Sequence, residues 1–162
     1  MILGMTLFTA VHVLISLIGI ASGLVVLSGL RTSNPMNGWT LLFLATTFAT
    51  SATGFFFSFR GFTPALGVGI VSMFILAATI AARYVFHLAG AWRWVYVVGV
   101  VAALYFNSFV LVVQSFLKIP TLHTLAPTGT EPAFAVAQSF VLVFFLVMGF
   151  LAVRGFHPPR GA

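Results

Sequence analysis

Two amide side chains and a lysine interrupt an otherwise apolar stretch, ALYFNSFVLVVQSFLK, beyond the middle of the chain. Asn107, Gln114 and Lys118 fall on one face of a helix, because their spacing matches whole helical turns. Hydrocarbon offers an amide no hydrogen-bond partner, so these groups are expected to face other helices, trapped water or a ligand. The sequence therefore predicts a polar stripe that is turned toward the inside of the molecule.

Two further polar side chains are predicted to reach a similar depth. At about 1.5 Å per residue, His12 lies about 9 Å inside its apolar segment, Gln138 about 8 Å and Gln114 about 5 Å. Together with Asn107 they are candidates for one pocket between the first, fourth and fifth apolar segments; ordinary hydrogen bonds between helices are the alternative. A long connector, KIPTLHTLAPTGTEP, would cover this pocket, and its charged or titratable members are Lys118, His123 and Glu131.

The histidines limit which cofactors the chain is able to hold. His12 and His87 differ by more than about 20 Å in depth, so they cannot ligate one haem iron as a pair. A haem held by His12 alone or completed by His123 stays open, as does a quinone bound by His12 and Gln114. A metal site of His12, His123 and Glu131 has no ligand-spacing motif behind it. We expect no metal and no resident cofactor.

The sequence carries no catalytic signature. It has no G-x-S-x-G, no H-E-x-x-H, no phosphate-binding loop and no dinucleotide-binding glycine pattern. It has no Cys, and its one acidic residue, Glu131, lies in a connector. Thiolate chemistry is therefore excluded, and a proton relay through an intramembrane carboxylate is disfavoured. We expect a protein that is not an enzyme.

The composition is that of an integral membrane protein. Hydrophobic residues make up 61% of the 162 residues and charged residues 5%, whereas soluble domains carry about a quarter charged residues. Seven Lys and Arg residues oppose one acidic residue, but they are scattered singly. This pattern is typical of membrane orientation and not of nucleic-acid binding, so the lipid bilayer is the expected partner.

Five apolar segments predict an all-α bundle of five transmembrane helices in a single domain that covers residues 1–162. The segments are residues 6–30, 39–59, 65–88, 92–117 and 133–155. Residues 65–117 are divided in two because one helix of that length would run about 80 Å, more than twice the thickness of the hydrocarbon core. The seven prolines all fall between segments or in the tail, so none interrupts a helix.

The charges in the connectors predict the orientation of the bundle. One end carries Arg60 and Lys118, opposed by Glu131. The other end carries Arg31, Arg83, Arg93, Arg154 and Arg160. Cytoplasmic connectors are enriched in Lys and Arg, so the end with five arginines is expected to be cytoplasmic. This places the N-terminus outside and the C-terminus inside.

Two helix faces are expected to be functional or closely packed. His12, Ser16, Gly19 and Gly23 form a stripe on which the G-x-x-x-G spacing lets another helix approach, either within the bundle or from a second copy of the chain. The second segment is crowded with hydroxyls at Thr46, Thr47, Thr50, Ser51 and Thr53. Each hydroxyl is expected to bond to a carbonyl of its own helix, the alternative being a polar lining that faces Asn107.

The stretches ALYFNSFVLVVQSFLKIP, LAPT followed by EP, and TGFFF resemble small inner-membrane proteins of bacteria. The resemblance implies a bacterial inner-membrane location and no particular activity. The leading hypothesis is a non-enzymatic membrane protein that acts as an interaction partner or small subunit of a membrane assembly. One alternative is a homo-oligomeric transporter or channel lined by the polar stripe beside Thr46 and Thr50. Another is a redox module that holds haem or quinone near His12.

Overall fold

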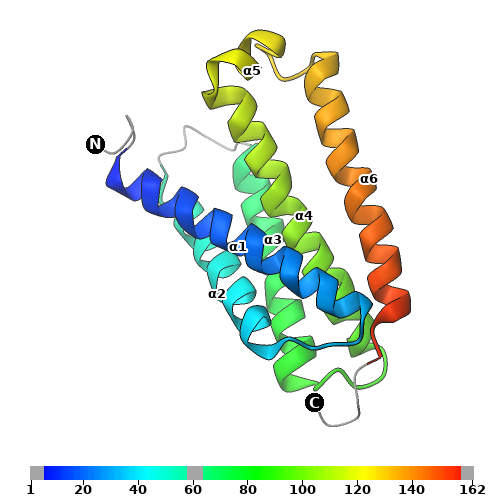
Figure 1. The fold of residues 1–162 in the computed structure, drawn as a ribbon. Helices are drawn as coiled ribbons and strands as arrows, with labels where there is room; N and C mark the ends of the chain where they lie inside the picture. The colour runs from blue at the N-terminus through cyan, green and yellow to red at the C-terminus, as the bar shows by residue number, and fades with distance from the viewer. Residues whose placement is uncertain (1–5, 58–63, 158–162) are drawn as a thin grey trace.

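The protein is a bundle of helices that run alternately in opposite directions (Figure 1). The computed structural model describes residues 6–57 and 64–157, and all regular secondary structure within these ranges is helical. The helices are α1 (Leu7–Arg31), α2 (Asn37–Gly54), α3 (Pro64–Ile80), the π-helical turn η1 (Ala81–Val85), α4 (Trp92–Lys118), α5 (Pro120–Leu125) and α6 (Pro132–Gly155). The expectation of an all-α protein is confirmed for this part of the chain.

Four of the described helices are long and apolar enough to cross a membrane, namely α1, α3 together with η1, α4 and α6. Each has 20 residues or more, which corresponds to about 30 Å or more at 1.5 Å per residue. The multi-pass membrane character is therefore supported by four helices. The fifth expected span, α2, is not among them: it has 18 residues, and its many hydroxyls dilute its hydrophobicity.

Two helix ends differ from those expected. The second segment leaves the helix after Gly54, and residues 58 and 59 lie outside the described ranges. The third segment is α-helical only to Ile80 and continues as η1 to Val85. His87 and Leu88 then have positive φ angles of 46° and 58°, so the helix ends before residue 88. Apolar composition cannot indicate either change, because apolar side chains are compatible with an α-helix, a π-helical turn and an irregular turn alike.

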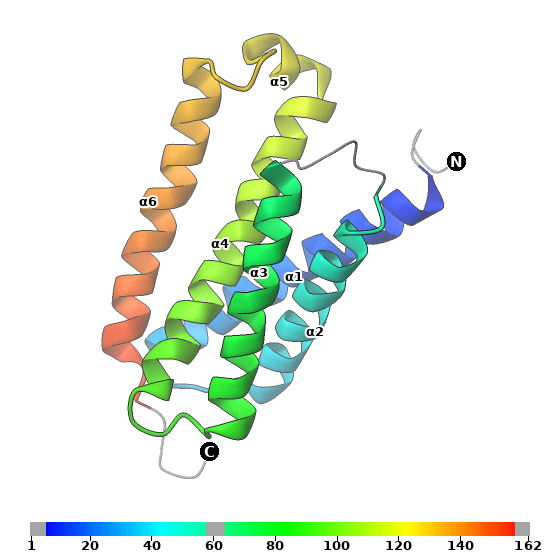
Figure 2. The ribbon, with the colours of Figure 1, turned by 180° about the vertical axis from the view of Figure 1, so that it is seen from behind.

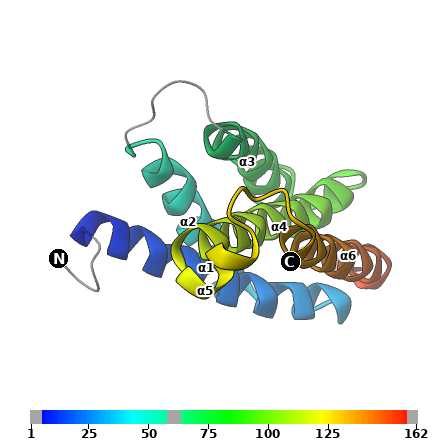
Figure 3. The same ribbon diagram turned by 90° about the horizontal axis from the view of Figure 1, so that it is seen from above.

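α4 is the centre of the bundle. It contacts α1, α2, α3, α5 and α6, and the views from behind and from above show the other long helices arranged around it (Figures 2 and 3). The helix that carries the predicted polar stripe is thus surrounded by its neighbours.

The two ends of the bundle differ in charge. Arg31, Arg83, Arg93 and Arg154 lie at the end where α1, η1 and α6 finish and α4 begins, which we call the arginine end. Lys118 lies at the opposite end, the lysine end, where α4 finishes. The grouping of these charges agrees with the sequence; Arg60 and Arg160 lie outside the described residues.

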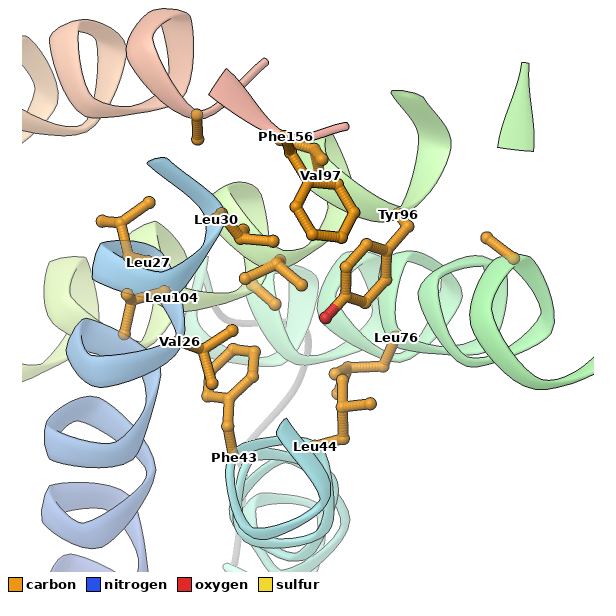
Figure 4. Close-up of a cluster of buried hydrophobic side chains, with 14 of the residues drawn as sticks. Val26, Leu27, Leu30, Phe43, Leu44, Leu76, Tyr96, Val97, Leu104 and Phe156 are labelled. Carbon is orange, nitrogen blue, oxygen red and sulfur yellow. The ribbon is translucent and has the colours of Figure 1, made fainter. Parts of the chain in front are cut away.

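The apolar core lies in the half of the bundle near the arginine end; Figure 4 shows its side chains in close-up. Its members are at most 5% exposed and include Val26, Leu27, Leu30, Phe43, Leu44, Leu76, Tyr96, Val97, Val100, Leu104 and Phe156. The core residues come from α1, α2, α3, η1, α4 and α6, and Phe156 is contributed by the segment after α6. Burial of these side chains is the main reason why the helices pack tightly at this end.

A clasp closes the arginine end by tying the residues after α6 to the turn after α1. The hydroxyl of Ser33 donates a 2.7 Å hydrogen bond to the carbonyl of Gly155 and accepts one of 2.6 Å from the amide of His157. The guanidinium of Arg93 donates to the carbonyl of Phe156. The clasp thus satisfies backbone carbonyls that the C-terminus of α6 would otherwise leave open.

The glycine stripe of α1 packs inside the bundle. A Cβ atom on Gly23 would lie 2.6 Å from Leu104 Cδ1 of α4 and 2.8 Å from the Phe43 ring of α2. A Cβ on Gly19 would lie 3.2 Å from Asn107 Nδ2 and 3.2 Å from the hydroxyl of Thr47. Close packing of this face within the bundle is confirmed. The glycine stripe therefore no longer supports contact between two copies of the chain, because it already packs on α2 and α4.

Candidate functional site

A cavity of about 810 Å³ lies in the half of the bundle near the lysine end. It is lined by the N-terminal half of α1, the C-terminal half of α2, the N-terminal half of α3 and the C-terminal half of α4. Its polar lining consists of Thr6, Thr9, His12, Ser16, Thr47, Thr50, Ser51, Ser72, Asn107, Gln114 and Lys118. Three phenylalanines, Phe55, Phe57 and Phe106, belong to its apolar lining. The volume is that of a typical small-molecule site.

The cavity is closed toward the arginine end. Its lining on α4 runs from Lys118 to Ala103, a rise of about 22 Å, and stops three residues from the fully buried Val100. On α2 it stops at Thr47, one turn from the fully buried Phe43. Beneath both positions lies the apolar core. The cavity is therefore a blind cup and not a passage through the chain.

The structure brings together four of the residues singled out from the sequence. His12, Asn107, Gln114 and Lys118 all line the cavity. Gln138 does not: it lies on α6, where its Nε2 donates a 3.2 Å hydrogen bond to the carbonyl of Phe109. The cavity consequently lies among α1, α2, α3 and α4, not between the first, fourth and fifth spans as expected. Depth along a helix can be counted from the sequence, but the order of helices around α4 cannot.

Asn107 joins α4 to α1 at the floor of the cavity. Its Oδ1 accepts a 2.7 Å hydrogen bond from the hydroxyl of Ser16, and the side chain is 8% exposed. Its Nδ2 lies 3.5 Å from the backbone carbonyl of Ser16, which is long for a hydrogen bond. The amide thus has the inward orientation that the sequence required, and one of its donors is only weakly satisfied.

His12 is held by a hydroxyl of α2 in one defined arrangement. Its Nδ1 lies 2.8 Å from the hydroxyl oxygen of Thr53, and that hydroxyl lies 2.6 Å from the carbonyl of Ala49. The single hydroxyl proton is donated to the carbonyl, so Thr53 accepts and His12 Nδ1 donates. The ring also packs edge-on against Phe57, with centroids 5.0 Å apart. In the neutral ring this leaves Nε2 as an acceptor for a ligand.

The threonine hydroxyls in the second half of α2 divide into two groups. Those of Thr46 and Thr53 bond back to the carbonyls of Leu42 and Ala49 at 2.7 and 2.6 Å, as expected for a membrane helix. Those of Thr47 and Thr50 are buried, line the cavity and have no hydrogen-bond partner among the described residues. For these two, the expectation of a bond to their own helix is wrong. A buried hydroxyl without a partner costs about 1–3 kcal/mol, which makes this pair the main chemical feature of the cavity.

The charge of the cavity is positive. Lys118 is the only charged residue that lines it in the described part of the chain. The only acidic residue of the protein, Glu131, is not part of the lining. A ligand with hydrogen-bond acceptors or a negative charge is therefore favoured over a cation.

The connector after α4 does not cover the cavity as expected. His123 lies exposed in α5, which begins at Pro120, and it does not line the cavity. Glu131 instead organises its own loop: it accepts hydrogen bonds of 3.0 Å from the amides of Thr128 and Thr130. No group of three His, Asp or Glu side chains forms within the described ranges, so the ligand set considered for a metal is not assembled there.

Acid is expected to loosen this loop. Hydrogen bonds from Thr128 hold the pKa of the Glu131 carboxyl below its ordinary value. A lowered pKa means that the carboxylate stabilises the loop fully above its ordinary pKa and loses this effect as the pH falls through the lowered value. Amide hydrogen exchange at Thr128 and Thr130 should therefore become less protected at acidic pH and, in Glu131→Gln, at neutral pH as well. Equal protection in both proteins at neutral pH would contradict this role.

Comparison with known proteins gives no indication of the function of this chain. No protein-family model matches the chain, and no curated protein and no solved structure matches it significantly. The function is therefore argued from the geometry and chemistry of the cavity.

Proposed function

We propose that this protein is a non-enzymatic membrane protein that binds a small amphiphile in the blind cavity. The observation that carries the proposal is the pair of buried, unpartnered hydroxyls of Thr47 and Thr50 at the cavity wall. Each offers a donor that a carbonyl or carboxylate oxygen would accept. The phenylalanines of the lining would contact the apolar body of the same molecule.

A quinone or a short anionic lipid fits this chemistry best. Both combine oxygen acceptors with an apolar part, and Lys118 at the lysine end favours negative charge. A haem has less support, because His12 is the only histidine that lines the cavity within the described residues. A continuous channel through one chain has less support as well, because the apolar core closes the cup.

We propose five membrane crossings with the arginine end in the cytoplasm of a bacterium. α1 and α3 run in the same direction (Figure 1), so α2 between them has to lead the chain back across the same thickness. Its length of 18 residues, about 27 Å, is close to the hydrocarbon thickness. Three of its polar side chains, those of Thr47, Thr50 and Ser51, line the cavity. The four described arginines at one end support an N-out and C-in orientation.

The expected protein partner or membrane assembly stays a prediction. The glycine stripe of α1, which suggested contact with a second copy of the chain, packs against α2 and α4 of the same chain. The cavity, by contrast, is complete within one chain. Ligand binding is therefore the function that the arrangement of the described residues supports best.

Binding can be measured with a reporter inside the cavity. The native tryptophans Trp39, Trp92 and Trp94 lie near the starts of α2 and α4, at the arginine end. Phe106 lines the cavity, so Phe106→Trp adds one fluorophore there. A short-tailed benzoquinone is expected to quench this fluorophore saturably in detergent, and octanoate is expected to compete with it. The wild-type protein should show only weak, unsaturable quenching.

Each outcome of this experiment has a defined meaning. Competition by octanoate supports a shared acceptor site, and saturable quenching without competition supports a quinone site. If Phe106→Trp gives no saturable signal beyond that of the wild type with either probe, the cavity does not bind this class of molecule and the proposal fails.

A further inference from the structure

A second polar site lies at the arginine end, away from the cavity. Arg83 in η1 borders a pocket of about 470 Å³ together with Asn37, Gly38, Leu41, Tyr84 and His87. Its Nη2 donates a 2.5 Å hydrogen bond to Asn37 Oδ1. Its Nη1 is buried and has no hydrogen-bond acceptor among the described residues. The guanidinium therefore keeps one donor group without a partner.

The chain has no acid with which to balance this cation. The single acidic residue of the protein is Glu131, which lies at the start of α6, at the lysine end. Instead, the guanidinium carbon lies 5.2 Å from the centroid of the Tyr96 ring and 5.7 Å from that of the Tyr84 ring. The rings stabilise the cation but supply no negative charge. Arg83 is partly buried, and partial removal of a cation from water without a counterion is costly, so a negatively charged ligand would stabilise it.

The other groups around the pocket also favour an anion. Asn37 accepts from Arg83 through Oδ1, which leaves its Nδ2 as a donor, and Tyr84 and His87 can each donate. α2 begins at Asn37 and has no side-chain cap, so the positive end of its helix dipole adds positive potential to the pocket. A Cβ atom on Gly38 would meet nothing within 4 Å, so this side is open.

The backbone beside the pocket has an unusual conformation. Arg83 lies in the π-helical turn η1, a form that often marks functional positions. His87 has a φ of 46°, which a side chain other than that of glycine adopts at a cost of about 1–3 kcal/mol. The turn and the following residue together place the guanidinium and the imidazole at one pocket. Left-handed residues also end ordinary helices, so what supports a binding site is the placement of the Arg83 and His87 side chains at one pocket.

We propose that this pocket binds a phosphate group, provided either by the head group of an anionic phospholipid or by a soluble phosphate compound. The planar guanidinium suits phosphate oxygens through paired hydrogen bonds. Leu41 and Val85 are 60% and 64% exposed beside it, where the acyl chains of a lipid would lie. The site is independent of the amphiphile cavity, because no residue lines both.

Native mass spectrometry of the delipidated protein in detergent tests this site. Phosphatidylglycerol is titrated in one arm, and inorganic phosphate is added as a competitor in the other. Arg83→Gln is expected to weaken lipid binding about tenfold, because it removes charge-assisted hydrogen bonds. Arg154→Gln is the matched control: it removes the same charge from an exposed residue at the same end and should leave binding unchanged.

A second variant keeps the test decisive if Arg83→Gln does not fold. His87 is exposed and lies outside the helices, so His87→Glu should fold; it supplies the missing acid to Arg83 and should weaken lipid binding by a similar factor. Displacement of the lipid by inorganic phosphate assigns a soluble phosphate ligand, and lipid binding that resists phosphate assigns the head group. Equal losses in Arg83→Gln and Arg154→Gln, or unchanged binding in His87→Glu, would overturn the proposal.

Discussion

Gly23→Val is expected to lower the free energy of unfolding by about 3 kcal/mol, through overpacking of the core. The first atom of any side chain at this position would lie 2.6 Å from Leu104 Cδ1 and 2.8 Å from the ring of Phe43. Both neighbours are fully buried, so neither can move aside without displacing the helix behind it. Denaturant titration in detergent, followed by circular dichroism, measures the loss.

Gly38→Val is the control for this prediction. It makes the same exchange in a helix, but a Cβ at this position meets nothing within 4 Å. Its free energy of unfolding should stay within about 0.5 kcal/mol of the wild-type value. Equal losses in the two variants would mean that intrinsic propensity, and not the contact between α1, α2 and α4, decides the effect of Gly23.

Loss of the hydroxyls of Thr47 and Thr50 is expected to weaken ligand binding about tenfold while the fold becomes more stable. The double variant Thr47→Val/Thr50→Val keeps the shape of both side chains and removes two buried donors without partners. Each removal should stabilise the protein by about 1 kcal/mol, because no internal hydrogen bond is lost. The loss of two hydrogen bonds to a ligand accounts for the weaker binding of the benzoquinone.

Thr46→Val separates a binding effect from a general effect of the substitution. Thr46 lies one turn from Thr50 on the same helix, but its hydroxyl bonds to the carbonyl of Leu42 and it is not part of the cavity lining. It should bind the probe like the parent protein and gain no stability. If the double variant lost stability instead, its hydroxyls would have partners within the fold, and the chemical basis of the proposed site would disappear.

Sequence patterns predicted most of the helices because the bilayer imposes their length. The fold-back between α3 and α4 followed from helix rise alone, and the inward orientation of Asn107 followed from the cost of an amide in hydrocarbon. The five-residue π-helical turn at Arg83 and the left-handed residues His87 and Leu88 could not be predicted, because they depend on packing at the arginine end.

The site was predictable in part, because depth along a helix can be counted from the sequence. Counting residues gave the depths of His12 and Gln114, and both line the cavity. The same count placed Gln138 at that depth, but α6 directs its amide to Phe109 instead. Which of the α2 hydroxyls lack partners is decided by their direction around the helix and by neighbours that a single sequence does not identify. The sequence alone therefore could not identify the hydroxyls of Thr47 and Thr50 as the ones without partners in the described part of the chain.

The hydrogen bond from Ser33 to Gly155 joins residues that are 122 positions apart. During biosynthesis this contact therefore stays unmade until the ribosome has translated α6 as far as Gly155. Contacts of such long sequence separation form late and slowly. A nascent chain stopped short of Gly155 would leave Ser33 without this acceptor, so the clasp forms only after α6 has been translated.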